Sequence, residues 1–252
     1  MKLPLLTTLF LFLAVSVNTA DAQVRRPPRV PPAAKSADIG KTAVVIDETL
    51  SVLRDKPSLY SQSIQRMRRG RAIKILDVTE ADGVKFYKVI APPRNYGWVQ
   101  ADAVFGKFRS IDEERLAKFV QASNGFEQIE VAVEFFALYP TSKFRPAMLL
   151  LYGDLLEDIG LRMSKDATSR LSRREMAATN APLYSYYLNY VGLDRYRKLG
   201  VVFLFNSSTK LFHYDGESWK EIVTKFPTSP EAAEARKRLD LLRTKLDRSA
   251  AK

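Results

Sequence analysis

Short apolar runs separated by turn residues fill the chain between residues 43 and 106. The runs AVVID, RAIKILDV and VKFYKVIA are rich in Val, Ile, Phe and Tyr, which favour β-strands, and Pro, Gly and Asp occur in the intervals between them. Several short strands at this spacing predict a small β-barrel. In RAIKILDV the apolar residues fall on both alternating sets of positions, so the pattern predicts a strand without indicating which face turns inward.

Beyond Lys107 the apolar spacing changes to every third or fourth residue. The segment SIDE has the form of a capping box, in which Ser110 and Glu113 each satisfy a backbone amide where a helix begins. Apolar stripes at helical spacing follow it, and they predict antiparallel helix pairs over residues 110–248. The stripes are Phe126, Ile129, Val133 and Phe136; Met148, Leu151, Tyr152, Leu155 and Ile159; Trp219, Ile222, Val223 and Phe226; and Ala235, Leu239, Leu242 and Leu246.

An aromatic-Pro-Thr-Ser phrase occurs twice, beginning at Tyr139 and at Phe226. Because proline disfavours the helical conformation at the residue before it, each aromatic residue is expected to end a helix. Ser229 is placed to cap the next helix in the second copy, and Thr141 or Ser142 in the first. Each copy therefore predicts a helix-turn-helix corner.

The interval between the two corners has three parts. Residues 164–179 are polar, and residues 183–199 are rich in tyrosine. The tyrosines stand at helical spacing beside apolar residues, which favours core packing; the alternative is that they stack on sugar rings. They are Tyr184, Tyr186, Tyr187, Tyr190 and Tyr196. Residues 201–216 predict a β-hairpin that turns around residues 206–209, or else irregular structure.

The first 22 residues have the pattern of a secretory signal peptide. Lys2 precedes an apolar run over residues 3–17, and the small residues of ADA end at Ala22, before a predicted cleavage at Gln23. The run is shorter than the roughly 20 apolar residues that a membrane-spanning helix needs, and no later segment reaches that length. We therefore expect a periplasmic or secreted protein with no membrane span after cleavage.

Residues 23–42 are rich in proline and cations and have few apolar groups. Such a segment cannot bury a core, and its prolines favour an extended backbone, so we expect a stiff, solvated linker. It contains the spacing Arg25-x-x-Pro28-x-x-Pro31, which eukaryotic SH3 domains recognise. The alternative is that this spacing is a general property of Pro-rich spacers.

Composition narrows the classes of chemistry further. The chain has no cysteine, which excludes disulfides, thiolate catalysis, cysteine zinc sites and a lipidated cysteine. Its net charge of +12 favours anionic partners. Cations cluster at residues 66–71, 170–174 and 195–198. Export argues against nucleic acid as the partner, and clusters of this kind usually form solvated surfaces.

Catalytic constellations are not evident. The only histidine, His213, has no second histidine for a metal or triad pair, so we interpret it as a packed or hydrogen-bonded residue. Asp154, Glu157 and Asp158 could converge on a metal, but an ion pair between Asp158 and Arg162, four residues on, favours a solvated helix face. The chain has no Gly-rich phosphate loop and no Gly-x-Ser-x-Gly elbow. We expect no enzyme activity, cofactor or metal.

The strand-rich region resembles a bacterial SH3-like domain. The resemblance rests on LSVLRDKPS, RRGRAIKIL, FYKV and YGWVQADAVF, which follow one another in that family's order and spacing. It implies recognition of peptide or cell-wall material without catalysis. The Gly-Trp-Val element carries Trp98, which with Tyr96 and Tyr87 forms the candidate ligand groove. The alternative is that Trp98, flanked by Gly and Val in a small barrel, packs in the core.

The two corners resemble tetratricopeptide-like units of exported bacterial envelope proteins, in which Tyr-Pro-x-Ser and then a small residue open the second helix. Ala235 occupies the small position in the second copy, whereas Met148 in the first implies a wider helix spacing. The interval between the copies is not a multiple of the roughly 34-residue repeat, so they are not neighbours in one regular array.

Together these features predict an α+β multidomain protein, with a small SH3-like β-barrel over residues 43–106 and an α-helical tetratricopeptide-like domain over residues 110–248. The leading hypothesis is a non-enzymatic scaffold of the cell envelope that holds a protein partner on its helical domain. A second hypothesis is that the barrel binds peptidoglycan, another anionic polymer or a peptide. A third, a carboxylate-dependent envelope hydrolase, requires two acids facing one cleft.

Overall fold

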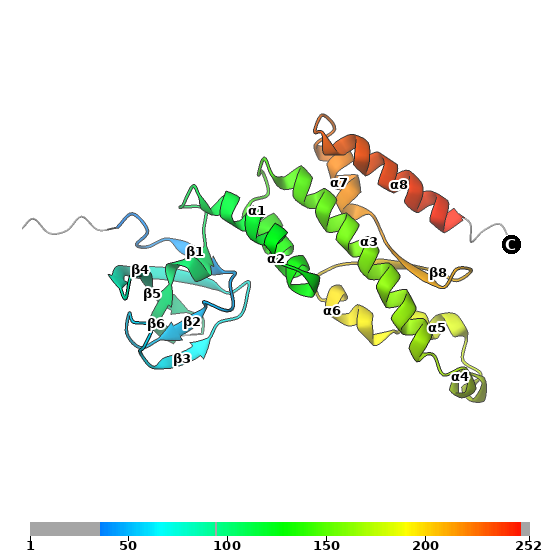
Figure 1. The fold of residues 1–252 in the computed structure, drawn as a ribbon, viewed down its shortest axis with the longest axis horizontal. Helices are drawn as coiled ribbons and strands as arrows, with labels where there is room; N and C mark the ends of the chain where they lie inside the picture. The colour runs from blue at the N-terminus through cyan, green and yellow to red at the C-terminus, as the bar shows by residue number, and fades with distance from the viewer. Residues whose placement is uncertain (1–35, 94, 248–252) are drawn as a thin grey trace, which may run out of the picture. The chain divides into compact units, whose positions relative to one another are not determined.

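The computed structural model describes residues 36–93 and 95–247 (Figure 1). The predicted signal peptide, its cleavage site between Ala22 and Gln23, and residues 23–35 of the predicted linker lie outside the described residues.

The last residues of the predicted linker pack on a β-sheet. The carboxylate of Asp38 accepts hydrogen bonds from the ammonium group of Lys85 and the hydroxyl of Tyr87, each at 2.7 Å. The amide of Gly40 donates to the carbonyl of Ile75 at 2.8 Å. The packed part of the chain therefore begins before residue 43, where the barrel was expected to start, because residues 38–40 already have partners on the sheet.

One curled antiparallel sheet contains seven strands (Figure 1). The strands are β1 (Thr42–Val45), β2 (Val52–Arg54), β3 (Ser63–Arg66), β4 (Ala72–Ala81), β5 (Val84–Ala91), β6 (Asn95–Gln100) and β7 (Val104–Phe105), in the order β3-β2-β6-β5-β4-β1-β7. A short 3-10 helix, η1 (Ala101–Ala103), precedes β7.

Strand β4 shows why its sequence pattern looked ambiguous. Ile73 and Ile75 are buried, while Ala72, Lys74 and Leu76 are exposed, so the first half alternates cleanly. The register with β5 then shifts between Ile75 and Asp77. A bulge inserts one extra residue and reverses which positions face inward, which breaks a two-residue periodicity.

Helices make up most of the chain after residue 111. They are α1 (Asp112–Ala122), α2 (Gly125–Leu138), α3 (Arg145–Arg170), α4 (Arg173–Thr179), α5 (Leu183–Leu188), η2 (Val191–Leu193), α6 (Asp194–Arg197), α7 (Glu217–Lys225) and α8 (Glu231–Asp247). Strands β8 (Phe203–Asn206) and β9 (Leu211–Tyr214) pair antiparallel in the segment where a hairpin was expected. The long helix α3 packs against α2, α7, α8 and β9. The predicted α+β class is confirmed.

The predicted capping box at residues 110–113 does not form, so this prediction is wrong. Helix α1 begins at Asp112, and its N-terminus has no side-chain cap. Asp112 is fully buried, and its carboxylate accepts hydrogen bonds from the guanidinium groups of Arg109 at 2.7 Å and Arg115 at 2.9 Å. These charge-assisted bonds fix the start of α1 in place of a cap from Ser110.

Helices α2 and α7 end at the residue before the aromatic of the repeated phrase, as predicted. The amides of Tyr139 and Phe226 each donate to the carbonyl four residues earlier, at 2.9 and 2.8 Å. The amide of Ser142 then donates to the carbonyl of Tyr139 at 3.2 Å, and that of Ser229 to Phe226 at 3.0 Å. The same backbone turn therefore occurs twice.

The serine caps predicted at these corners are wrong. Helix α3 has Phe144 at its N-cap position, without a side-chain cap, and the hydroxyl of Ser142 accepts from the Phe144 amide at 3.0 Å before the helix begins. The hydroxyl oxygen of Ser229 is buried and has no hydrogen-bond partner in the part of the chain that the structure describes. The turns are therefore closed by backbone hydrogen bonds.

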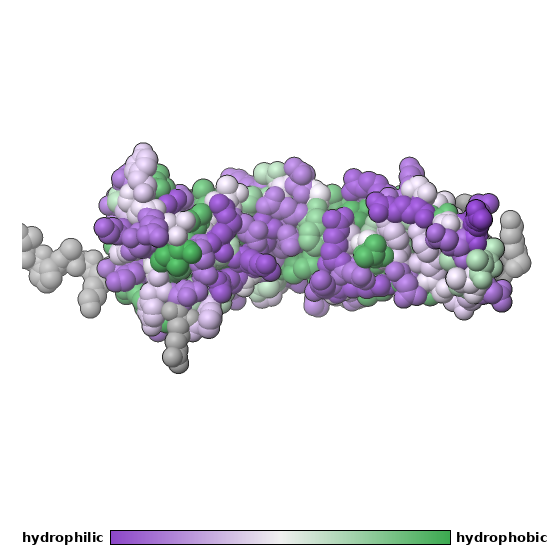
Figure 2. All heavy atoms as spheres, turned by 90° about the horizontal axis from the view of Figure 1, so that it is seen from below, coloured by the Kyte–Doolittle hydropathy of each residue, from purple (hydrophilic) through white to green (hydrophobic). Residues whose placement is uncertain are grey.

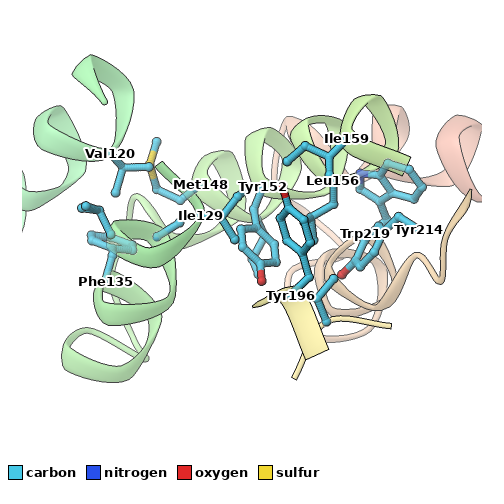
Figure 3. Close-up of a cluster of buried hydrophobic side chains, with 14 of the residues drawn as sticks. Val120, Ile129, Phe135, Met148, Tyr152, Leu156, Ile159, Tyr196, Tyr214 and Trp219 are labelled. Carbon is cyan, nitrogen blue, oxygen red and sulfur yellow. The ribbon is translucent and has the colours of Figure 1, made fainter. Parts of the chain in front are cut away.

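A single hydrophobic cluster runs through the helices and the β8–β9 hairpin (Figure 3). Every residue of the four predicted stripes is buried in this cluster or packs against it. The stripe predicted for α2 omitted Phe135, which is fully buried, because α2 contacts both α1 and α3 and so buries more than one face. Figure 3 shows Trp219 and Tyr214 beside Leu156 and Ile159 of α3.

Candidate functional site

A groove of about 390 Å³ lies between α3 and α8. Trp219 of α7 and Leu242 of α8 line it and are almost completely buried, whereas Leu241 of α8 is 54% exposed. Its lining residues are Asp154, Glu157, Asp158, Leu161, Trp219, Arg238, Leu241, Leu242 and Lys245. The groove therefore combines an apolar floor with charged rims, acidic on α3 and basic on α8.

Two ion pairs join the rims. The guanidinium of Arg238 lies 3.0 Å from the carboxylate of Asp154, and the ammonium of Lys245 lies 2.7 Å from that of Glu157. Arg238 also contacts Glu234 on its own helix. These pairs link α8 to α3 across the groove.

Glu157 is the most heavily bonded acid of the groove. Its carboxylate oxygens lie 2.9 Å from Nδ1 of His213 and 3.0 Å from the amide of Tyr214, which donates to it. Burial opposes ionisation of Glu157, but hydrogen bonds from His213, Lys245 and Tyr214 outweigh it and hold its pKa below the usual value. His213 is itself buried, so the structure places it in a hydrogen-bonded role.

The predicted ion pair between Asp158 and Arg162 is absent from the described residues, and this prediction is wrong. Asp158 lines the α3–α8 groove, whereas Arg162 lines a different cleft, beside α2 and α6. Residues four apart lie roughly 40° apart around a helix, and here that difference turns the two side chains towards different neighbours. Asp158 is consequently an exposed acid on the groove rim without a paired cation among the residues described.

The structure divides the three residues of the candidate sheet groove between two faces. Tyr87 is fully buried, and its hydroxyl donates to Asp38. Burial and this hydrogen bond raise the pKa of Tyr87 above its usual value. Tyr96 and Trp98 stand two apart on β6 and so share the other face, where Tyr96 is 56% exposed and Trp98 partly so. Trp98 and Tyr96 therefore lie together, and Tyr87 does not join them.

Trp98 lies in a row of side chains that crosses the sheet. In the register of the strands it stands opposite Arg54 of β2 on one side and Lys88 of β5 on the other. The ammonium of Lys88 lies 5.9 Å from the Trp98 ring centroid, within the range of a cation–π contact. A partly exposed aromatic ring between two cations suits an anionic polymer that also offers an apolar or sugar face.

The tyrosine-rich segment is largely core. Tyr187, Tyr190 and Tyr196 are buried, and the Tyr187 ring stacks on Phe205 with centroids 4.6 Å apart. Tyr184, by contrast, is exposed. The core packing favoured by the helical spacing of these tyrosines therefore holds for the three buried ones.

The face drawn in Figure 2 is mostly hydrophilic, with apolar patches between the polar residues.

Sequence reasoning missed the α3–α8 groove, although it had found most of its apolar and acidic residues.

Within the described residues no three His, Cys, Asp or Glu side chains group so as to hold a metal ion. Among the described helices, none combines the length and hydropathy that a membrane crossing requires. Comparisons of the chain with models of known protein families, with curated proteins and with solved structures found no match.

Proposed function

We propose that this protein is an exported, non-enzymatic binding protein of the cell envelope, and that its helical part holds a protein partner. The observation that carries the proposal is the α3–α8 groove, with its buried apolar floor and charged rims. An apolar centre surrounded by polar groups is the usual layout of a protein-binding surface. Leu241 is a large apolar side chain exposed at this groove, where a partner would cover it.

The charges on the rims indicate what the partner carries. Asp154 and Glu157 are already paired with cations of α8, so they are not free to act as an acid and base pair in hydrolysis. Asp158 is exposed and has no paired cation among the described residues. A partner segment with an apolar residue for the floor and a basic residue for Asp158 would complement the groove.

The fold supports the family resemblance on which this proposal also draws. We propose that residues 43–106 form an SH3-like barrel and residues 110–248 a tetratricopeptide-like domain. The curled antiparallel sheet supports the first. The two corners support the second, because their backbone hydrogen bonds match pair by pair.

Site-specific photocrosslinking in the native envelope tests this function. A photoreactive amino acid at Leu241 is expected to trap one protein, identified by mass spectrometry, whereas the same group at Arg243 is expected not to. Arg243 is the matched control because it is exposed on the same helix but lies roughly 160° around the axis from Leu241. Asp158→Lys is expected to weaken the crosslink from Leu241. Equal yields of the same products from both positions would contradict binding in the groove.

A second candidate function belongs to the sheet. The row of Arg54, Trp98 and Lys88 favours binding of an anionic cell-wall polymer, such as peptidoglycan, or an acidic peptide. In this alternative the helical part supports the sheet. The salt dependence of wall binding distinguishes it from general attraction to a protein of net charge +12.

A further inference from the structure

A second cleft, of about 310 Å³, opens on a different side of α3 from the groove described above. It lies between the start of α2, the middle of α3 and helix α6. Its lining residues are Gly125, Phe126, Ile159, Arg162, Met163, Asp166, Arg195 and Tyr196. The α3 residues of the two clefts are centred roughly a third of a turn apart around the helix axis, so the sites are separate.

Arg195 is held in place by aromatic rings and keeps most of its donors free. Its guanidinium carbon lies 4.9 Å from the centroid of the Phe126 ring and 4.8 Å from that of Tyr196. One of its nitrogens donates to the Tyr196 hydroxyl at 2.9 Å. No carboxylate in the described part of the chain pairs with it. A guanidinium has five N–H donors, so a planar fork remains for a ligand.

Arg162 provides a second cation at the same cleft. Its side chain is exposed at the cleft, and no carboxylate pairs with it within residues 36–93 and 95–247. The one acid of the lining, Asp166, already has partners, since it accepts from the hydroxyl of Tyr190 and from Arg170 at 2.8 Å. Two arginines therefore face the cleft against one carboxylate whose charge is offset by a third arginine.

The start of α2 adds to the positive field of the cleft. Asn124, at the N-cap, makes no side-chain cap bond, so the first amides of this 14-residue helix are not capped by it. No heavy atom lies within 4 Å of the point where a side chain would begin at Gly125. The helix dipole favours negative charge at this end. This contribution supplements the two arginines and would not define a site without them.

The remaining lining is apolar. Ile159, Met163 and Tyr196 are buried, and Phe126 packs against the same cluster (Figure 3 shows Ile159 and Tyr196). Binding sites for small molecules typically combine such a lining with a few polar groups that fix orientation. We propose that this cleft binds a small organic carboxylate, with its carboxylate held by Arg195 and Arg162 and its apolar body resting on Ile159 and Met163.

Calorimetric titration of the mature full-length chain with phenylacetate and with hexanoate tests the proposal. Saturable binding of at least one is expected, and phenylacetamide, which lacks the charge, is expected to bind at least about tenfold more weakly. Acetate and inorganic phosphate, which lack the apolar body, are expected to bind more weakly too. Absence of saturable binding by both organic carboxylates, or equal binding of phenylacetate and phenylacetamide, would overturn the proposal.

Variants place the binding in this cleft. Arg195→Gln and Arg162→Gln are each expected to lower the affinity about tenfold or more, and Arg195→Lys is expected to restore little because it lacks the planar fork. Lys198→Gln, an exposed cation just after α6, is the matched control and is expected to change nothing. If Arg195→Gln unfolds, as circular dichroism would reveal, Arg162→Gln decides. An equal loss in the control variant would show attraction to general positive charge and would reject the site.

Discussion

Arg145, the first residue of α3, binds Glu221 of α7 across the two helix pairs, with two guanidinium nitrogens 2.8 Å from one carboxylate oxygen. Both side chains are mostly buried, and Arg145 also donates to the carbonyl of Phe136 at 3.0 Å and lies over its ring. The pair thus connects the residues just after the first corner with the helix that leads into the second. An ion pair in this position fixes the distance between the two corners.

Arg145→Met is expected to lower the free energy of unfolding by roughly 1 to 3 kcal/mol, between the small effect of exposed pairs and the larger effect of fully buried ones. Urea denaturation measures it, and a double-mutant cycle with Glu221→Gln isolates the coupling between the two side chains. The comparison is Lys118→Met, which breaks an exposed pair with Glu114 and is expected to cost less than about 0.5 kcal/mol. Similar losses for both variants would show that burial of the Arg145 pair has no energetic importance.

The second corner depends on close helix packing at Ala235, which is fully buried on α8. Ala235→Leu is expected to destabilise the protein by roughly 1 to 3 kcal/mol, because the added methylenes have no space in the contact with α7. Lys237→Leu on the same helix is exposed and is expected to change the stability little. Equal shifts of the thermal midpoint at the two positions would count against close packing at this corner.

Local effects in the sequence were predictable, whereas effects that depend on distant neighbours were not. The ends of α2 and α7 follow from the proline after Tyr139 and Phe226, which acts on the adjacent residue alone. The start of α1 depends instead on burial of Asp112 between two arginines, which the SIDE pattern does not contain. Glu113, which a capping box would direct back to the start of the helix, instead accepts from the hydroxyl of Ser142, a residue far along the chain.

The same distinction applies to the candidate sites. Asp158 and Arg162 have the spacing of an ion pair, but each faces a different cleft because α3 contacts several elements at once. Arg195 stacks on Phe126, which is far away in the sequence, so no local sequence pattern predicts the cleft between α2, α3 and α6. Apolar stripes, in contrast, identified core residues correctly, because a helix in a packed protein buries its apolar face whichever element covers it.

The hydrogen bonds of Glu157 predict how stability depends on pH. Because the folded-state pKa of Glu157 lies below its usual value of 4.5, its ionisation contributes stability above that value, and the contribution is lost as the pH falls through the folded-state pKa. Glu157→Gln is therefore expected to destabilise the protein near neutral pH and to have progressively less effect in acid. Urea unfolding of both proteins from about pH 7 to about pH 3 measures the difference.

Asp215 provides the opposite case. Burial raises its pKa above the usual value of 3.8, so its contribution to stability is present in acid and is lost as the pH rises through the folded-state pKa. The wild type is expected to gain stability relative to Asp215→Asn as the pH falls, opposite in sign to the comparison with Glu157→Gln. Matching slopes for the two variants would mean that the local partners of these acids do not determine the pH dependence.

The row of Arg54, Trp98 and Lys88 on the sheet yields a prediction that ranks the two candidate functions. The mature chain is expected to sediment with purified peptidoglycan at low salt, because a net charge of +12 attracts any anionic polymer. At 0.5 M salt the Debye length falls to roughly 4 Å, and attraction between exposed charges fades. Binding to peptidoglycan by charge alone should then disappear. At low salt, an unrelated polyanion should bind the chain as well as peptidoglycan does.

Recognition through the row of Arg54, Trp98 and Lys88 would respond differently to salt. It would survive 0.5 M salt and would weaken on Trp98→Ala in a protein that remains folded by circular dichroism, because contact with the ring does not depend on screening. Tyr60→Ala is the matched control, since Tyr60 is 90% exposed on the same part of the chain but lies outside the row.

We expect salt to abolish most wall binding, because Trp98 is flanked by two cations and a partly exposed ring offers a small apolar contact. The α3–α8 groove would then be the main binding surface, holding its partner through apolar contacts that salt does not weaken. Salt-resistant sedimentation that Trp98→Ala abolishes and Tyr60→Ala preserves would reverse this ranking and make the sheet the primary site.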